Sequence, residues 1–234
     1  MRTKHVISFV TLLACVAAVV QPAPVLANSD TKAWQFDVLL DGKPIGYHTF
    51  NLVDEGDRRV LETEARFDVK FLFINAFSYR HQSTEVWSDD CLQSIDAMTD
   101  SNGKQLVVRG QSDEQSFELQ QPQDNELSTC VKTFAYWNPS VLDSERLLNP
   151  QTGQYEDVAV TYERAETVEV AGQPVDAFRY RLETRGGDIT LWYSSGTKTW
   201  VGLEAPAKGG RTLSYRAKVV PLASTHTQML ANGN

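Results

Sequence analysis

Apolar and polar side chains alternate with a period of two along most of the chain beyond residue 33. The clearest stretch is 61–69, in which small or apolar residues take every second position and acidic or basic residues take the others. A period of two puts one set of side chains on each face of a β-strand, which is typical of an antiparallel sheet with one buried and one solvated face. The alternation predicts strands over 34–40, 45–53, 61–69, 77–87, 92–98, 106–111, 116–120, 158–164, 167–170, 175–184, 189–193, 199–203 and 212–219.

Short turn sequences separate the predicted strands. Asn102-Gly103 is a strong hairpin signal, Asp41-Gly42 is typical of a turn, and glycine pairs stand at 186–187 and 209–210. Linkers this short predict an all-β fold in a single domain over residues 28–234. We expect a strongly curved antiparallel sheet or an open β-barrel of about ten to twelve strands, with one short helical or loop excursion.

Two stretches lack the alternation. Residues 70–74 (KFLFI) form a continuous apolar run, which predicts either a strand buried on both faces or an apolar loop covering the mouth of the sheet. Residues 133–153 are irregular, and within them Pro139 and Pro150 bracket a short stretch in which Ser140 has the chemistry of a helix N-cap. We expect a short helix there, in a loop long enough to contribute to function.

The first 27 residues have the order of a secretory signal peptide. Arg2 and Lys4 form a basic start, Val6–Val20 is an apolar run of 15 residues, and Val25–Ala27 is suited to cleavage after the alanine. A run of 15 residues is shorter than the ~20 that span a bilayer. No other segment approaches that length, so we expect no transmembrane segment in the mature chain. In a rival interpretation, the four residues ending at Cys15 form a lipobox, and Cys15 becomes a lipid-carrying N-terminus.

Cys91 and Cys130 remain after removal of the predicted signal peptide. An even number of cysteines in an exported chain predicts a disulfide between them. The alternative is a redox or metal-binding pair, but neither a C-x-x-C spacing nor a histidine close in sequence favours it.

Charge and motifs narrow the function classes. The 234-residue chain has a formal net charge of −8 and no run of Lys or Arg in its mature part, which argues against nucleic acid as a partner. A Gly-rich phosphate loop, a dinucleotide fingerprint, H-E-x-x-H and G-x-S-x-G are all absent, so we assign no cofactor and no catalytic residue. His48, His81 and His226 are too far apart in sequence to assign a metal site, and Glu62 and Glu64 are interpreted as surface charges.

Two candidate ligand-binding residues, His81 and Tyr79, lie in the predicted strand 77–87. His81 shares a predicted strand face with Tyr79 and with Ser83, and Glu85 and Trp87 lie further along the same face. A face that mixes aromatic and polar groups is typical of a ligand cavity. The alternative is a hydrogen-bonded histidine at the margin of the sheet.

A second group of candidates lies at 134–139, where three aromatic residues stand next to an amide and a proline. Tyr136, Trp137 and Asn138 are therefore candidate ligand contacts, because aromatic rings with a polar group suit recognition. In the alternative interpretation, these rings plug one end of the barrel.

Further candidates are more scattered. Trp192, Arg211 and Tyr215 are candidates in an aromatic-plus-arginine set that also includes Trp200. Its guanidinium either binds an anion or lies exposed at the surface. Phe71 and Phe73, from the continuous apolar run, are included as apolar ligand contacts.

Four separated motifs resemble one protein family: residues 39–50 (LLDGKPIGYHTF), 135–139 (AYWNP), 147–153 (LLNPQTG) and 210–216 (GRTLSYR). They are similar to exported Gram-negative proteins grouped as domain of unknown function 6134. The resemblance extends over nearly the whole mature chain and implies a periplasmic all-β protein, with no activity or catalytic residues to transfer. The hairpin-first layout is also similar, in architecture only, to the half-barrels of periplasmic lipoprotein carriers.

Three functions are compatible with these observations. The first is a non-enzymatic periplasmic binder of an apolar or amphiphilic envelope molecule, such as a lipid or acyl chain. It is favoured by the aromatic residues, the apolar run at 70–74 and the missing catalytic motifs. The alternatives are a hydrolase that uses His81 with a carboxylate, and an envelope scaffold protein that pairs through a sheet edge.

Overall fold

The computed structural model describes residues 30–71, 74–113, 115–120 and 125–222. The predicted signal peptide, the rival lipobox at Cys15, and His226 lie outside these residues. In the described part of the chain, no helix has the length and apolar character needed to cross a membrane.

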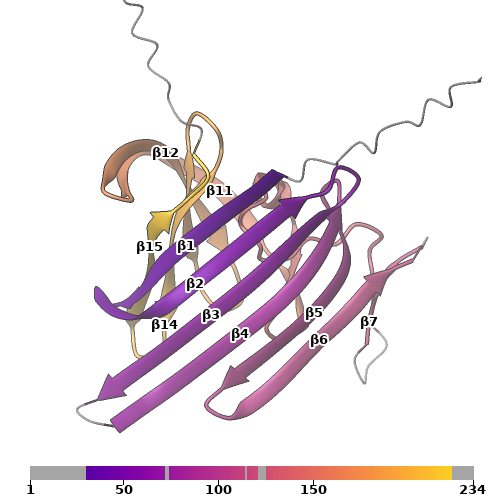
Figure 1. The fold of residues 1–234 in the computed structure, drawn as a ribbon, viewed down its shortest axis with the longest axis horizontal. Coiled ribbons are helices and arrows are strands. Elements are labelled where there is room, and N and C mark those ends of the chain that lie inside the picture. Colours follow the sequence, from indigo (N-terminus) through magenta and orange to yellow (C-terminus); the bar gives the residue numbers. More distant parts are fainter. Residues whose placement is uncertain (1–29, 72–73, 114, 121–124, 223–234) are drawn as a thin grey trace, which may run out of the picture.

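The described residues form a large antiparallel sheet, which confirms the predicted fold class (Figure 1). Thirteen strands follow one another in the order β11-β12-β13-β14-β15-β1-β2-β3-β4-β5-β6-β7-β8, and a separate hairpin contains β9 and β10. The strands are β1 Asp30–Leu40, β2 Lys43–Asp54, β3 Arg59–Phe71, β4 Ile74–Ser88, β5 Cys91–Ser101, β6 Lys104–Ser112, β7 Phe117–Leu119, β8 Asn125–Leu127, β9 Arg146–Leu148, β10 Tyr155–Asp157, β11 Ala159–Val170, β12 Gln173–Glu183, β13 Ile189–Ser194, β14 Trp200–Ala207 and β15 Arg211–Val219.

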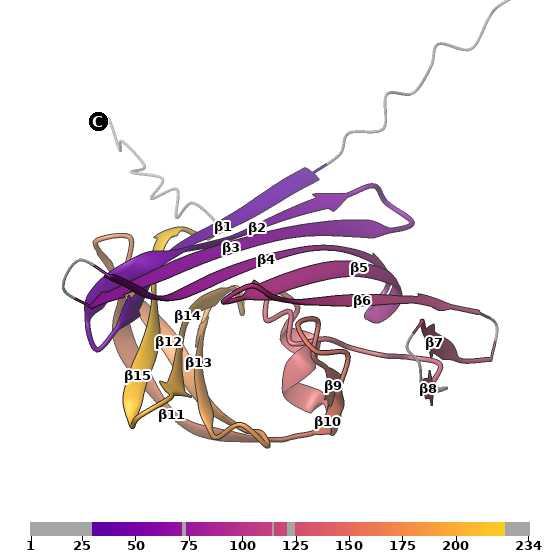
Figure 2. The ribbon, with the colours of Figure 1, turned by 90° about the horizontal axis from the view of Figure 1, so that it is seen from below.

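The sheet is curled but not closed. Figure 2 shows β1–β6 as an arched layer, with β11–β15 curling back beneath one side of it and β9 and β10 beneath the other. The first and last long strands join the two parts, because β1 pairs with β15 and sets Val38 opposite Tyr215. The backbone N–H of Ala171 donates to the carbonyl of Ala217, which brings the end of β11 back against β15.

Tight turns connect the long strands where the sequence predicts them. At Asp41-Gly42 and at Asn102-Gly103 both residues have positive φ, which is the conformation of the turn that joins antiparallel strands in two residues. The predicted strands 158–164 and 167–170 are one strand in the structure, β11, which has a bulge between Tyr162 and Arg164. The bulge interrupts the alternation, and this is why the pattern appeared to be two strands.

The irregular stretch predicted at 133–153 lies on the concave side of the sheet (Figure 2). Its helix is a short 3-10 helix, η1 Pro139–Asp143, and the N-cap is Asn138 rather than Ser140. The side-chain oxygen of Asn138 accepts from the backbone N–H of Ser140, so the cap lies one residue before the proline that starts the helix.

A disulfide between Cys91 and Cys130 attaches this segment to the start of β5, as the cysteine count predicts. Next to it, the backbone N–H of Leu92 donates to the carbonyl of Val131. The apolar run 70–74 is at the tip of the β3–β4 hairpin, where Phe71 pairs with Ile74; residues 72 and 73 lie outside the described residues.

The main core lies between the concave face of the sheet and the segment 131–148. Its largest fully buried side chains come from the beginning, middle and end of the sequence and include Phe36, Trp87, Phe117, Tyr193 and Trp200. Burial of aromatic and aliphatic area on this scale is the main stabilising contribution to an open sheet of this kind.

Candidate functional site

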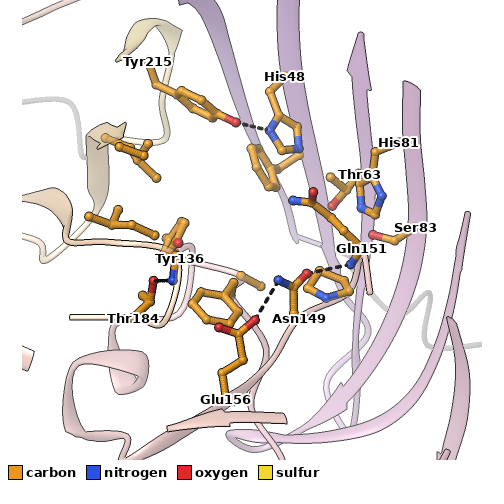
Figure 3. Close-up of a pocket in the computed structure, with 18 of the residues that line it drawn as sticks. His48, Thr63, His81, Ser83, Tyr136, Asn149, Gln151, Glu156, Thr184 and Tyr215 are labelled. Carbon is orange, nitrogen blue, oxygen red and sulfur yellow. Dashed lines mark hydrogen bonds between the residues drawn. The ribbon is translucent and has the colours of Figure 1, made fainter. Parts of the chain in front are cut away.

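A cavity of about 400 Å³ lies on the concave side of the sheet. Its floor comes from β2, β3 and β4, its wall from β13, β14 and β15, and its remaining side from the segment 134–156. Figure 3 shows side chains of the three groups converging on this space. The volume is in the range of about 300–1,000 Å³ that is typical of small-molecule sites.

The register of β2, β3 and β4 brings several polar side chains together on the floor. His48 on β2 and His81 on β4 both pair with Ala65 on β3, so the two imidazoles lie on the same face with a small residue between them. Two residues further along, on the same face, Thr63 on β3 pairs with Ser83 on β4, and both line the cavity. The register therefore gathers two imidazoles and two hydroxyls within three adjacent strands.

His48 is held by the opposite wall. Its Nδ1 is 2.9 Å from the Tyr215 hydroxyl (Figure 3). Its ring stacks on Phe50 at a centroid distance of 4.1 Å. Its Nε2 is buried and has no hydrogen-bond partner in the described protein. Burial, together with the nearby His81, lowers the pKa of His48 well below its usual value, so the ring is neutral.

His81 has a different partner. Its Nδ1 is 2.9 Å from the Thr99 hydroxyl on β5, and the side chain is buried. Burial lowers the pKa of His81 to about 4. It is therefore a neutral hydrogen-bonding group near neutral pH.

Glu85 is the most unusual residue of the floor. It is only 1% exposed, although carboxylates are rarely buried. Its Oε2 accepts from the Trp87 indole N–H at 3.1 Å and from the Thr133 hydroxyl at 3.0 Å. Burial raises the pKa of Glu85 to about 7, and the two hydrogen bonds oppose that rise.

Aromatic rings from the wall, the floor and the irregular segment meet at the cavity. Trp200 is fully buried, with ring centroids 5.2 Å from Phe50 and 5.4 Å from Tyr136. The Tyr193 hydroxyl donates to the backbone carbonyl of Tyr136 at 2.9 Å and so fixes the irregular segment against β13. The cavity lining therefore combines a rigid apolar surface with the polar side chains of the floor.

Polar side chains surround the opening. The side-chain amide of Asn149 donates to Glu156 on β10 at 3.1 Å, and its oxygen accepts from the backbone N–H of Gln151 (Figure 3). Thr184 and Arg185 line the cavity from the β12–β13 connection, and Arg185 is exposed.

Three of the candidates chosen from sequence line this cavity: His81, Tyr136 and Tyr215. Trp137 and Asn138 are buried beside it but face away, toward an open depression at the start of β1. Trp137 packs edge-on against Trp87, and the Asn138 amide donates to Asp90.

The other candidates lie away from the cavity. Tyr79 stacks on Phe67 in a small separate cluster. Trp192 donates from its indole N–H to Glu166 on the outer face, and Arg211 forms an ion pair with Asp41 at the surface. For Phe71 only the backbone is described, at the end of β3, and Phe73 lies outside the described residues.

Sequence reasoning missed His48, Phe50 and Thr63 as lining residues, and it placed Trp200 in the aromatic-plus-arginine set without selecting it as a ligand contact. The alternation places His48 and Phe50 on one face of their strand, but it does not reveal which part of that face lies over a cavity. Among the described residues, no cluster of three or more His, Cys, Asp or Glu side chains is placed to hold a metal ion.

Comparisons with known proteins show a family and a fold. The family model described as "Domain of unknown function (DUF6134)" matches residues 36–218. The comparison with curated proteins gave no match. Among solved structures, a beta-barrel-like protein of domain of unknown function DUF1849 from Brucella abortus is similar, with a TM-score of 0.57 and 9% identity over 80% of this chain and 95% of that chain. At that identity the likeness shows the fold alone.

Proposed function

The chain belongs to the family described as domain of unknown function DUF6134, and because that description names no activity, we propose a function from the cavity itself. The protein is a non-enzymatic binder of an apolar or amphiphilic envelope molecule, such as a lipid or an acyl chain. The observation that carries this proposal is the cavity of about 400 Å³, whose lining combines aromatic rings with buried polar side chains.

The two surfaces of the cavity suit an amphiphile. Phe50, Tyr136 and Trp200 supply rigid rings on which a chain gains favourable apolar contact. His48, His81 and Glu85 supply polar atoms that orient a head group. A ligand that is polar at one end and apolar at the other satisfies both surfaces.

A hydrolase is less well supported. Catalysis by a histidine base needs an acid or an amide that orients the imidazole, as well as a nucleophile within hydrogen-bond reach. In the described structure, the partner of His81 Nδ1 is Thr99, while the carboxylate of Glu85 bonds to Trp87 and Thr133. The scaffold alternative requires a filled interior, so the cavity favours binding over that role.

The proposal includes the place where the protein acts. The basic and apolar start of the sequence supports export to the periplasm, where envelope lipids are accessible. The mass of the mature N-terminus tests this part: a chain that begins at Asn28 supports export with cleavage, whereas an acylated Cys15 supports the anchored form.

The binding test uses protein purified from the envelope of its own host. We expect native mass spectrometry to show an adduct that is released on denaturation and is extracted by organic solvent. After the bound molecule has been removed, a fluorescent alkyl probe should bind the protein at one site. The probe and the extracted molecule should compete for that site.

Two matched variants locate the binding. Ser83→Phe fills the cavity from β4, whereas Thr84→Phe adds the same ring to the exposed face of the same strand. We expect Ser83→Phe to lose most of the probe binding and Thr84→Phe to retain it, with both proteins showing a β-type circular dichroism spectrum. If Ser83→Phe does not fold, Ala205→Phe fills the cavity from β14. Equal binding by the folded filling variant and Thr84→Phe, or no adduct and no probe uptake by the wild type, would overturn the proposal.

A further inference from the structure

The charges around the cavity differ from those of a fatty-acid site. Two carboxylates line it, Glu85 from β4 and Glu156 from β10, and both side chains are buried. The one basic side chain among the described lining residues is Arg185, which is exposed at the opening. Burial keeps the two histidines of the floor neutral. Above about pH 7, where Glu85 is ionised, the interior therefore offers negative charge and hydrogen-bond acceptors, and none of the described lining residues supplies a buried cation to meet an anionic head group.

The carboxylate of Glu85 has one oxygen left for a ligand. Both of its hydrogen bonds from the described residues, from Trp87 and from Thr133, fall on Oε2. Glu85 lines the cavity, so Oε1 is the atom that remains to accept from a guest. A buried carboxylate oxygen without a hydrogen bond lowers the stability of the folded protein, and a donor on a bound ligand would offset that loss.

A second polar atom of the floor is also without a partner. His48 Nε2 is buried and unbonded, while the Tyr215 hydroxyl holds the other ring nitrogen. His48 and Glu85 both line the cavity, from β2 and β4. Two independent groups thus leave a hydrogen-bonding atom unused in the same cavity, and buried polar atoms normally have partners.

On the premise that the cavity binds an amphiphile, we propose that its ligand carries a hydrogen-bond-donating head group, above all an amine, which contacts Oε1 of Glu85. The apolar part of this ligand lies against Phe50 and Trp200. An ammonium group next to a buried carboxylate forms a charge-assisted hydrogen bond, which is stronger than a neutral one. A carboxylate or phosphate head would instead bring a second negative charge close to the first at low dielectric.

The test compares three probes that share one chain and differ in the head group: decylamine, decanol and decanoate. Each has about eleven or twelve heavy atoms and, at the roughly 30 Å³ that a water-sized group takes in a liquid, occupies about 350 Å³, which the cavity can hold. Binding is measured by calorimetry at pH 8, below the concentration at which each probe forms micelles. We expect the amine to bind about tenfold or more tightly than decanoate, with decanol between them.

Glu85→Gln tests whether this preference comes from the proposed contact. Glutamine keeps an oxygen that accepts from Trp87 and Thr133 but removes the charge. Glu62→Gln is the matched control, because it removes the same charge from the exposed face of the neighbouring strand β3. We expect Glu85→Gln to weaken decylamine binding about tenfold while changing decanol binding by less than about threefold, and Glu62→Gln to change neither.

The outcomes separate this inference from the proposed function. If none of the three probes binds the wild type, the binding function itself fails. If decanoate binds as tightly as decylamine, or if Glu85→Gln leaves the ratio of the two affinities unchanged, the binding function stands and the donor-headed ligand is excluded. If Glu85→Gln does not fold, the three affinities of the wild type still show whether the cavity prefers a donor head group.

Discussion

Glu85 makes the stability of the protein depend on pH in a particular direction. Burial raises the pKa of this carboxyl to about 7 in the folded protein, from 4.5. Between these two pH values, the folded state holds a proton that the unfolded chain has released. The contribution of Glu85 to stability is therefore fully present below about pH 4.5 and is lost as the pH rises through about 7.

We predict that Glu85→Gln removes the loss of stability that Glu85 causes as the pH rises. From pH 4.5 to pH 8, the free energy of unfolding of the variant should rise by about 3 kcal/mol relative to that of the wild type, because each pKa unit corresponds to about 1.4 kcal/mol. Urea unfolding at a series of pH values measures this difference. His48 and His81, which also line the cavity, are present in both proteins, so their contributions to the pH dependence are common to both.

Glu62→Gln, on the solvated face, serves as the reference substitution for this experiment. Its stability should follow the wild type at every pH to within about 0.5 kcal/mol. A difference between Glu85→Gln and the wild type that stays constant from pH 4.5 to 8 would show that Glu85 does not titrate in this range.

A second prediction at the residue scale concerns the pair His48 and Tyr215. Tyr215→Phe removes the hydroxyl bonded to His48 Nδ1 and leaves both nitrogens of this buried ring without a partner. We expect a loss of about 1–3 kcal/mol in the free energy of unfolding, measured by urea denaturation. Tyr162→Phe, at a residue that is 53% exposed, should cost less than about 0.5 kcal/mol. Equal costs for the two variants would contradict the assigned role of the hydroxyl.

The polar floor could be predicted from the sequence only in part. The alternation along β4 puts His81, Ser83 and Glu85 on one face, and this is the face that the structure buries. What makes the burial of Glu85 tolerable is a hydrogen bond from Thr133, 48 residues away in the irregular segment. No periodicity links those two residues, so the environment of the carboxyl became apparent only in the folded structure.

At the scale of elements, regular strands were predictable and the irregular segment was not. The predicted strand 61–69 lies within β3 because local alternation decides which face of a strand is buried. The strands β9 and β10, of three residues each, are too short to show a period. Their positions depend on tertiary contacts, such as the donation from the backbone N–H of Leu148 to the carbonyl of Lys132.

The disulfide leads to a prediction for this segment. Cys91 and Cys130 are 39 residues apart, and a cross-link over a loop of that length contributes about 4 kcal/mol in the chain-entropy estimate. We expect the double variant Cys91→Ala/Cys130→Ala to lose a stability of that order, measured by urea unfolding. Because the bond attaches the segment to β5, amides of β9 and β10 should lose hydrogen-exchange protection before those of β2–β4.

The double substitution leaves no free thiol in the described residues, so thiol chemistry does not complicate the comparison. Reduction of the wild type without substitution should give the same order of loss in protection. Uniform loss over β2–β4 and the β9–β10 hairpin would show that the disulfide stabilises the whole sheet rather than the segment.

At the scale of the whole molecule, one core joins the two ends of the chain. Trp200 on β14 lies 4.5 Å from Phe36 on β1 between ring centroids, and 5.4 Å from Tyr136 in the irregular segment. The indole N–H of Trp34 also donates to the backbone carbonyl of Trp200. A single side chain therefore contacts the first strand, the last part of the sheet and the segment that lines the cavity. Sequence could identify Trp200 as apolar and strand-forming, but not as the residue where these parts meet.

We therefore predict that Trp200→Leu destabilises the sheet as one unit. The substitution should lower the free energy of unfolding by about 3–5 kcal/mol, because the side chain is fully buried and the lost ring leaves a cavity. Hydrogen exchange should show protection falling together in β3 and in β12. Trp192 lies half-buried on the outer face of the adjacent strand β13. Trp192→Leu should lower the free energy of unfolding by about 1 kcal/mol and leave hydrogen exchange in β3 unchanged. Loss of protection in β12 with β3 unaffected in Trp200→Leu would show that the two parts of the sheet unfold independently, and that the cavity between them opens without unfolding of the arched layer.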